Sequence, residues 1–254
     1  MDADLAGCTN ITVPSDIFVP IFIMTRDRVS SLRVALESYE RTIKSPYEII
    51  ILDHNSSYPP MLAYLRMLKA QKIIIKKLTS PSWNGALSEA KQEVREYLEW
   101  KNSDSQFYVF TDPDIALLRT APDLLLFYAG VLLACPEIDT IGPALQISDI
   151  PPQFTKRLKN KNMSVFEWES QFWRSVPSIA TWNGVGYHIA SEPIDTTFSM
   201  YRRNLITHRH AARESTLRAY APYAAVHVDW YQDSANLPAD KLFYIQQQTG
   251  ANNW

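Results

Sequence analysis

The first 115 residues alternate four times between a segment typical of a buried strand and a segment typical of an amphipathic helix. The strand-like segments are rich in β-branched and aromatic residues, as strands covered on both faces should be. Strands are expected at 16–25, 47–52, 72–78 and 107–110, with helices at 30–43, 59–68 and 86–100 between them. Parallel strands are joined by helical crossovers, so the alternation predicts an α/β fold with a mostly parallel central sheet flanked by helices.

The second half of the chain is less regular. We expect helices at 122–135, 165–173 and 238–248, strands at 140–147, 194–201 and 224–228, and a loop at 182–186. There is no internal repeat and no low-complexity linker, and 254 residues can form one large domain. The sequence therefore predicts a single domain with two halves, 16–115 and 116–254.

The fourth strand-like segment runs into two aspartates one residue apart, Asp112 and Asp114. Pro113 cannot donate to a sheet ladder, so the strand ends there. Ligands of open α/β sheets bind at such carboxyl ends. Two adjacent carboxylates repel each other and favour a hard divalent cation, Mg²⁺ or Mn²⁺, whose remaining ligands are commonly water and substrate phosphates. The pair predicts a metal–diphosphate site, and the alternative is a strand-to-turn junction.

Polar residues also follow the first two strands. Asp53 ends the second strand, where a carboxylate can accept hydrogen bonds from a nucleobase or ribose, and its alternative role is a turn or helix cap. Arg26 and Arg28 lie at the end of the first strand and can neutralise phosphate, unless they are simply exposed arginines. Neither a G-x-G-x-x-G fingerprint nor a glycine-rich phosphate loop is present, so a bound diphosphate would depend on metal and side chains.

Composition excludes several classes of protein. The net charge is −2 and no basic stripe indicates nucleic acid. No apolar run reaches the roughly 18 residues of a membrane span, so no integral membrane segment is expected. Cys8 and Cys135 do not form a disulfide framework, which favours a reducing compartment. The expected location is cytoplasmic, either free or peripheral to a membrane, and the sequence does not indicate an oligomeric state.

Four segments in this order resemble a nucleotide-sugar glycosyltransferase of the GT-A (Rossmann-like) fold, in the style of glycosyltransferase family 2. The segments are Ile21–Arg26, Ile50–Ser57, Trp83–Ala86 and Val109–Asp114. The resemblance covers residues 16–115. It implies metal-dependent transfer of a sugar from a nucleoside diphosphate sugar, UDP-linked by preference, to a hydroxyl of a glycan or other acceptor. Mn²⁺ or Mg²⁺ is the implied cofactor, residues 16–115 bind the donor, and residues 116–254 bind the acceptor.

The resemblance also implies roles for single residues. Asp112 and Asp114 match the D-x-D motif, which binds the metal and the sugar nucleotide. Asp53 matches the residue that contacts the base, and the implied nucleotide-binding set is completed by Thr25, Arg26 and Asn84. A late histidine completes the metal site in many GT-A enzymes, and His227 is the best match; a satisfied strand histidine is the alternative.

An inverting transferase needs a carboxylate that deprotonates the acceptor hydroxyl. Asp195 is the first choice, because a solitary carboxylate in a strand-like run needs a reason. Its alternative role is that of an aspartate that only hydrogen-bonds Thr196 or Thr197. The alternatives are Glu192, Asp149, Glu167 and Glu169. Inversion is the expected outcome, but the family's common Glu-Asp base pair is not found in this sequence, so the identity of the base and the choice between inversion and retention stay open. Trp182, His188 and Trp230 are the expected acceptor-side residues, and core packing is the alternative for the two tryptophans.

Two rival functions follow from the same pattern. A nucleotidyltransferase acting on sugar phosphates also joins an α/β sheet to a carboxylate–metal site, but the first strand lacks the glycine-rich basic loop that would support it. A non-catalytic glycan- or nucleotide-binding module would not need both aspartates of the pair.

Overall fold

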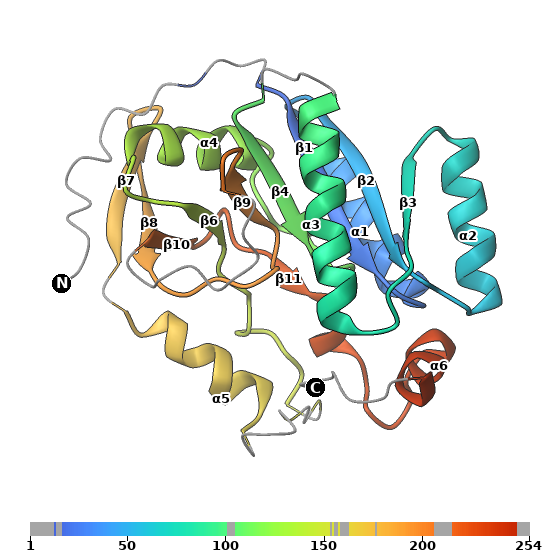
Figure 1. Ribbon diagram of the computed structural model, residues 1–254. Coiled ribbons are helices and arrows are strands. Elements are labelled where there is room, and N and C mark those ends of the chain that lie inside the picture. The colour runs from blue at the N-terminus through green and yellow to red at the C-terminus, as the bar shows by residue number, and fades with distance from the viewer. Residues whose placement is uncertain are drawn as a thin grey trace.

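The computed structural model describes residues 13, 17–100, 105–152, 154, 157, 163–175, 177–205 and 215–247. Its large sheet contains β1 (Val19–Thr25), β2 (Tyr47–His54), β3 (Ile74–Leu78), β4 (Phe107–Thr111), β6 (Thr140–Pro143), β7 (Ser178–Trp182), β8 (Val185–Ser191), β9 (Ser199–Arg202) and β10 (Thr216–Ala219). The strands lie in the order β3-β2-β1-β4-β9-β6-β10-β8-β7 (Figure 1). A separate pair is formed by β5 (Ile115–Ala116) and β11 (Val226–His227).

The first four strands are parallel, as the strand–helix alternation requires. Beyond β4 the sheet is mixed, because β9 runs antiparallel between β4 and β6, and β8 runs antiparallel to both β10 and β7. The helices are α1 (Val29–Thr42), α2 (Pro59–Ala70), α3 (Trp83–Trp100), α4 (Leu124–Ala134), α5 (Val165–Ser170) and α6 (Ala239–Gln247), with short 3₁₀ turns at Gln171–Trp173 and Val228–Tyr231. The predicted α/β fold with a helix-flanked central sheet is confirmed.

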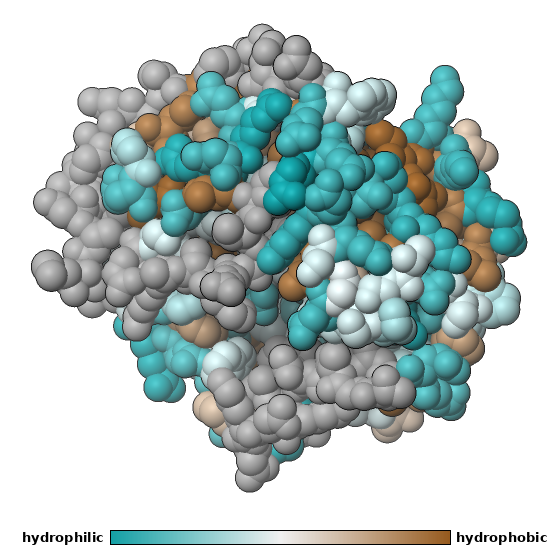
Figure 2. All heavy atoms as spheres, in the orientation of Figure 1, coloured by the Kyte–Doolittle hydropathy of each residue, from teal (hydrophilic) through white to brown (hydrophobic). Residues whose placement is uncertain are grey.

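Both faces of the parallel half of the sheet are buried. This explains why the sequence of β1 is almost wholly apolar. Ile21 and Ile23 belong to the core packed against α1, α2 and α4, whereas Phe22 and Met24 belong to the core under α3. Successive side chains of a strand point to opposite faces, so each face supplies its own hydrophobic layer. The outward face of α3 is covered by hydrophilic side chains (Figure 2).

Several expected boundaries are wrong in the second half. The segment 182–186 is not an extended loop but the tight turn of the β7–β8 hairpin, with Asn183 and Gly184 at φ values of 50° and 77°. Such values are those of an Asn-Gly hairpin turn. The strand expected at 194–201 is only β9, so residues 194–197 form a loop. Strand β10 was not predicted, because four residues without a clear alternation give no periodic signal.

Smaller differences concern the ends of elements. Helix α3 begins at Trp83, so Asn84 lies in its first turn rather than in a preceding loop. The strand expected at 140–147 ends at Pro143, and the chain after Val226–His227 turns into 3₁₀ helix instead of continuing as a strand.

Cys135 follows α4, is buried, and is disulfide-bonded. Disulfides persist mainly in oxidising compartments. This differs from the reduced cysteines expected from the cysteine count and removes that support for a cytoplasmic location. Among the described residues, no helix has both the length and the apolar character needed to cross a membrane.

Candidate active site

The ends of β1, β2 and β4 bring the predicted nucleotide-binding residues to one edge of the sheet. In the ladder between β1 and β2, Thr25 lies opposite Asp53, and in the ladder between β1 and β4, Ile23 lies opposite Thr111. The residues that follow Thr111 therefore emerge beside the end of β1. Parallel strands end on a common edge, which is where α/β sheets bind ligands.

Asp53 is buried at this edge, and its Oδ1 accepts a hydrogen bond of 3.3 Å from the backbone N–H of Ser56. Burial raises the pKa of the Asp53 carboxyl above its ordinary value, against the opposing effect of the Ser56 hydrogen bonds. Next to it, Thr25 is buried and its hydroxyl has no hydrogen-bond partner among the described residues. Buried polar atoms are usually paired, so this edge has capacity to bind a polar ligand.

Asp27 organises the loop that leads from β2 into α2 and was not predicted. Its φ is 54°, and its Oδ1 accepts hydrogen bonds of 2.7 Å from the backbone N–H groups of Ser57 and Tyr58. Its own N–H donates to Ser56 Oγ at 2.9 Å. Arg26 is half-buried beside it, with Nε 3.9 Å from Asp27 Oδ2. Asp27 thus fixes the positions of the residues around Arg26 and Asp53.

Asp112 is hydrogen-bonded to the loop between β8 and β9 through both its main chain and its side chain. Its N–H donates to the carbonyl of Thr196 at 2.8 Å, and its Oδ2 accepts from Thr196 Oγ1 at 2.5 Å. Burial, Asp114 and Asp195 together raise the pKa of the Asp112 carboxyl well above its ordinary value. Asp195 itself is exposed and accepts a 2.8 Å hydrogen bond from the N–H of Thr196. The fold therefore places the predicted base close to the predicted metal ligand.

Asp114 meets His227 through the small β5–β11 ladder. That ladder pairs His227 with Ile115, and the carbonyl of Asp114 accepts a 2.7 Å hydrogen bond from the N–H of Val228. His227 Nε2 lies 3.8 Å from Asp114 Oδ2, and the imidazole stacks on Trp230 with ring centroids 4.5 Å apart. The sequence-based expectation that His227 reaches the aspartate pair agrees with this geometry, and its role as a metal ligand stays a prediction.

A buried charge cluster of Arg28, Asp114, Asp229 and Lys241 lies behind the aspartate pair. Arg28 Nη2 donates to Asp114 Oδ2 at 3.0 Å and also to Asp229 Oδ1. Lys241 Nζ donates to Asp229 Oδ2 at 2.6 Å. All four residues are at most 7% exposed. Burial opposes the charge of Arg28, but Asp229 and Asp114 outweigh it, so the pKa of the guanidinium is raised.

Helix α6 completes this cluster from the C-terminal part of the chain. Asp240 Oδ2 accepts hydrogen bonds from the N–H of Ser30 at 2.6 Å and from Ser30 Oγ at 2.7 Å, which docks α6 on the N-terminus of α1. The Tyr244 ring lies 5.2 Å from the Arg28 guanidinium carbon and 5.5 Å from Lys241 Nζ. Figure 1 shows α6 as a short helix set apart from the sheet.

Sequence reasoning missed Asp229 and Lys241 and gave Arg28 only a passing role. A signal was available for Asp229, because a carboxylate between Val228 and Trp230 stands in an apolar run and buried charges need partners. No local signal marked Lys241, because lysines are common on helices and only tertiary packing buries this one.

Of the other predicted residues, two are exposed and two are buried in the core. Asn84 is exposed in the first turn of α3. His188 is exposed on β8. Trp182 is buried, donates from Nε1 to Asp123 Oδ2 at 2.8 Å and packs against Phe127. Trp230 is buried and supports His227 by stacking, which gives it a core contact next to the site rather than an exposed face.

The alternative carboxylates to Asp195 are engaged in structural contacts. Glu169 is ion-paired with Arg218, and Glu192 accepts from Ser175. The remaining two are exposed or partly exposed: Asp149 accepts from Arg119 at 2.5 Å, and Glu167 forms the capping box of α5 with Ser164. Asp195 differs from these four because Thr196 donates hydrogen bonds both to Asp195 and to Asp112.

The donor types at the site suit a hard divalent cation, since Asp112, Asp114 and His227 offer carboxylate oxygens and an imidazole. However, no group of three such side chains in the described residues is arranged closely enough to hold an ion. The hydrogen bonds explain this, because Asp114 faces Arg28 and Asp112 faces Thr196. The residues fit a divalent cation by the chemistry of their donor atoms.

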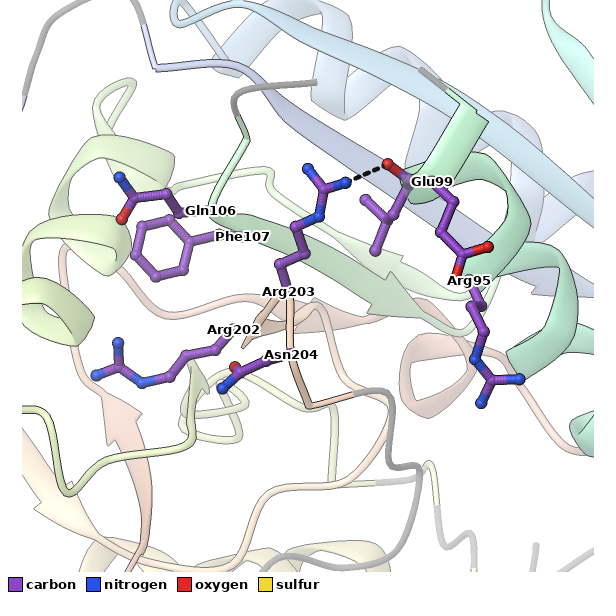
Figure 3. Close-up of a pocket in the computed structure, with 8 residues that line it drawn as sticks. Arg95, Glu99, Gln106, Phe107, Arg202, Arg203 and Asn204 are labelled. Atoms are coloured by element: carbon purple, nitrogen blue, oxygen red, sulfur yellow. Dashed lines mark hydrogen bonds between the residues drawn. The ribbon is translucent and has the colours of Figure 1, made fainter. Parts of the chain in front are cut away.

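A separate cavity of about 490 Å³ lies at the opposite end of β4, beside Gln106 and Phe107 (Figure 3). Two of the three arginines that line it are hydrogen-bonded to the main chain. Arg202 Nε donates to the carbonyl of Ile138 at 2.9 Å, and Arg203 Nη2 donates to the carbonyl of Leu98 at 2.5 Å. Because these guanidiniums bind main-chain carbonyls, the cavity is not a second candidate for the active site.

No protein-family model matches the sequence, and no curated protein matches it. Solved structures do match. A mannosyltransferase from Pyrobaculum calidifontis in complex with GDP-Man and Mn²⁺ aligns over 55% of this chain and 40% of its own, with 17% identity and a TM-score of 0.38. S. aureus TarS 1-349 in complex with UDP-GlcNAc aligns over 74% and 45%, with 13% identity and a TM-score of 0.41. GalNAc-T7 with UDP, GalNAc and Mn²⁺ aligns over 75% and 36%, with 13% identity and a TM-score of 0.46. This chain spans less than half the length of these three.

Proposed function

We propose that this chain is a metal-dependent glycosyltransferase with a GT-A site, which moves a sugar from a nucleoside diphosphate sugar, UDP-linked by preference, to a hydroxyl of a glycan or other acceptor. The observation that carries the proposal is the convergence of Asp53, Asp112, Asp114 and His227 at the carboxyl edge of parallel strands. Residues 16–115 bind the donor and residues 116–254 bind the acceptor.

The nucleotide-binding part uses the residues at the ends of β1 and β2. Asp53 and the buried hydroxyl of Thr25 face the base and ribose, and Arg26 faces the diphosphate. Asn84, in the first turn of α3, borders the nucleotide. Asp112 and Asp114 would hold Mn²⁺ or Mg²⁺ with His227 beside them, and a bound divalent ion supplies electrostatic stabilisation of the diphosphate leaving group.

The transfer step requires removal of a proton from the acceptor hydroxyl as its oxygen attacks the anomeric carbon of the donor sugar. Asp195 is the base in this proposal, because it is exposed and lies next to Asp112 through Thr196. Attack from the face opposite the leaving diphosphate gives inversion. Of the predicted acceptor-side residues, His188 is exposed on β8 and is the proposed acceptor contact, whereas Trp182 and Trp230 are buried in the core.

Donor binding is tested by a thermal-shift screen of UDP, GDP and their sugars with Mn²⁺, with Mg²⁺ and with chelator. A ligand present at 100 times its dissociation constant stabilises the protein by about 2.7 kcal/mol. We expect this shift with one nucleoside diphosphate and its loss on chelation. A flat response to every diphosphate at saturating metal would contradict the proposal.

Asp195→Asn is expected to keep donor binding and to lower the transfer rate by at least about 100-fold, because a positioned general base contributes roughly 10²–10⁴-fold. The measurement is the rate of transfer to an acceptor alongside the thermal shift with the donor. Glu167→Gln, which changes an exposed carboxylate of the α5 capping box, serves as the matched control. Equal turnover in Asp195→Asn and the native protein would remove Asp195 from the mechanism.

A further inference from the structure

The buried charge cluster is balanced without a metal ion. Two cations, Arg28 and Lys241, face two carboxylates, Asp114 and Asp229, and each contact is a hydrogen-bonded ion pair. Burying an ionised group is unfavourable unless an opposite charge compensates it. Asp114 therefore has its positive partner within the protein itself, and that partner is Arg28.

Asp112 is not ion-paired with any cation among the described residues. Its carboxylate accepts a hydrogen bond from the neutral hydroxyl of Thr196, and the effect of Arg28 on it is smaller than the opposing effects of the acidic residues Asp114 and Asp195. The site is thus compensated at Asp114 and short of positive charge at Asp112. A cation that binds between the two aspartates satisfies Asp112 but meets Arg28 at Asp114.

The contacts of Arg28 indicate how this conflict is resolved. Its hydrogen bonds to Asp114, Asp229 and Ser31 all start from Nη2, so a small rotation of the guanidinium releases one carboxylate and keeps the other. Asp229 is the better fixed of the two, because Ser31 Oγ donates to it at 3.1 Å and Lys241 Nζ at 2.6 Å. Arg28 can therefore keep its ion pair with Asp229 after its hydrogen bond to Asp114 is broken.

We propose that Arg28 is a built-in counter-cation for Asp114, which a divalent metal ion must displace, and that Asp229 and Lys241 hold Arg28 in place for this exchange. The inference rests on the proposed function for the identity of the cation. It gives α6 a role at the site, because α6 supplies Lys241 and the Tyr244 ring over Arg28. Arg28 is in these terms a positioning residue that acts through Asp114.

The test is direct titration of the metal-free full chain with Mn²⁺ alone, with free Mn²⁺ followed by its electron paramagnetic resonance signal. Arg28→Met removes one positive charge near the ion. A divalent cation and a guanidinium about 5 Å apart repel each other enough, even in water, to change the affinity for the cation by about tenfold. We expect Arg28→Met to bind Mn²⁺ at least about tenfold more tightly than the native chain. Arg28→Lys, which keeps the charge, is expected to restore the native affinity.

Arg33→Met is the matched control, because it makes the same substitution on the exposed side of α1, the helix that Arg28 precedes. If Arg28→Met does not fold by circular dichroism, Lys241→Met is the second variant, and we expect it to tighten Mn²⁺ binding by a smaller factor. Unchanged or weaker binding in the folded variant, or no Mn²⁺ binding by any of these proteins, overturns the exchange. Tighter Mn²⁺ binding without any response to nucleoside diphosphates would uphold it and overturn the proposed function instead.

Discussion

Asp112→Asn and Asp114→Asn are each expected to lower the rate of sugar transfer by at least about 100-fold and to abolish the metal-dependent thermal shift with the donor. The reason is that each change removes a carboxylate oxygen that would hold the metal, and even residues that only support a metal ligand contribute about 10–100-fold to affinity or activity. The measurements are the transfer rate and the donor-induced shift, with and without chelator.

Asp112→Asn is the sharper of these two variants because the fold should tolerate it. The pKa of Asp112 is raised in the folded state, so its contribution to stability is present below the unfolded pKa and is lost as the pH rises through the folded pKa. Above the unfolded pKa the buried Asp112 carboxyl therefore weakens folding, and the neutral amide of Asn removes that cost. Lost activity at undiminished stability would then be a chemical effect. Glu37→Gln, on the exposed face of α1, is the control, and native activity in both aspartate variants would rule out the proposed metal site.

Asp229→Ala is expected to lower the free energy of unfolding by about 3–5 kcal/mol, because breaking a buried pair leaves uncompensated charge inside the protein. Arg28 and Lys241 both lose their shared carboxylate in this variant while staying buried. The loss should appear as a lower urea midpoint in equilibrium unfolding, with α6 as the part of the chain that detaches most readily.

Glu37→Ala supplies the comparison for this measurement. Glu37 forms an ion pair with Arg41 one helical turn away, but the two side chains are 52% and 73% exposed. Exposed pairs of this spacing contribute only about 0.3–0.5 kcal/mol. A loss below about 1 kcal/mol in Asp229→Ala would mean that the buried charge cluster is not a significant source of stability.

Much of the first half of the chain was readable from local patterns. The near-continuous apolar runs gave β1, β2 and β4, and the polar residue at each strand end gave Asp53, Asp112 and Asp114. The predicted strands are confirmed, because a strand buried on both faces permits few polar residues, and a parallel sheet brings its carboxyl ends together. The roles of the three aspartates stay predictions. The same reasoning misplaced Asp195 in a strand, because the apolar run around it belongs partly to a loop that packs on Asp112.

Hydrophobic periodicity along the chain is enough to predict the α/β class, the parallel half of the sheet and the edge at which the acidic residues gather. What each acidic residue faces depends instead on tertiary contacts. Arg28 reaches Asp229 across 201 positions, and Lys241 arrives on a helix near the other end of the chain. No local pattern encodes such a pairing, because a buried ion pair depends on where distant segments meet and on how completely they exclude water.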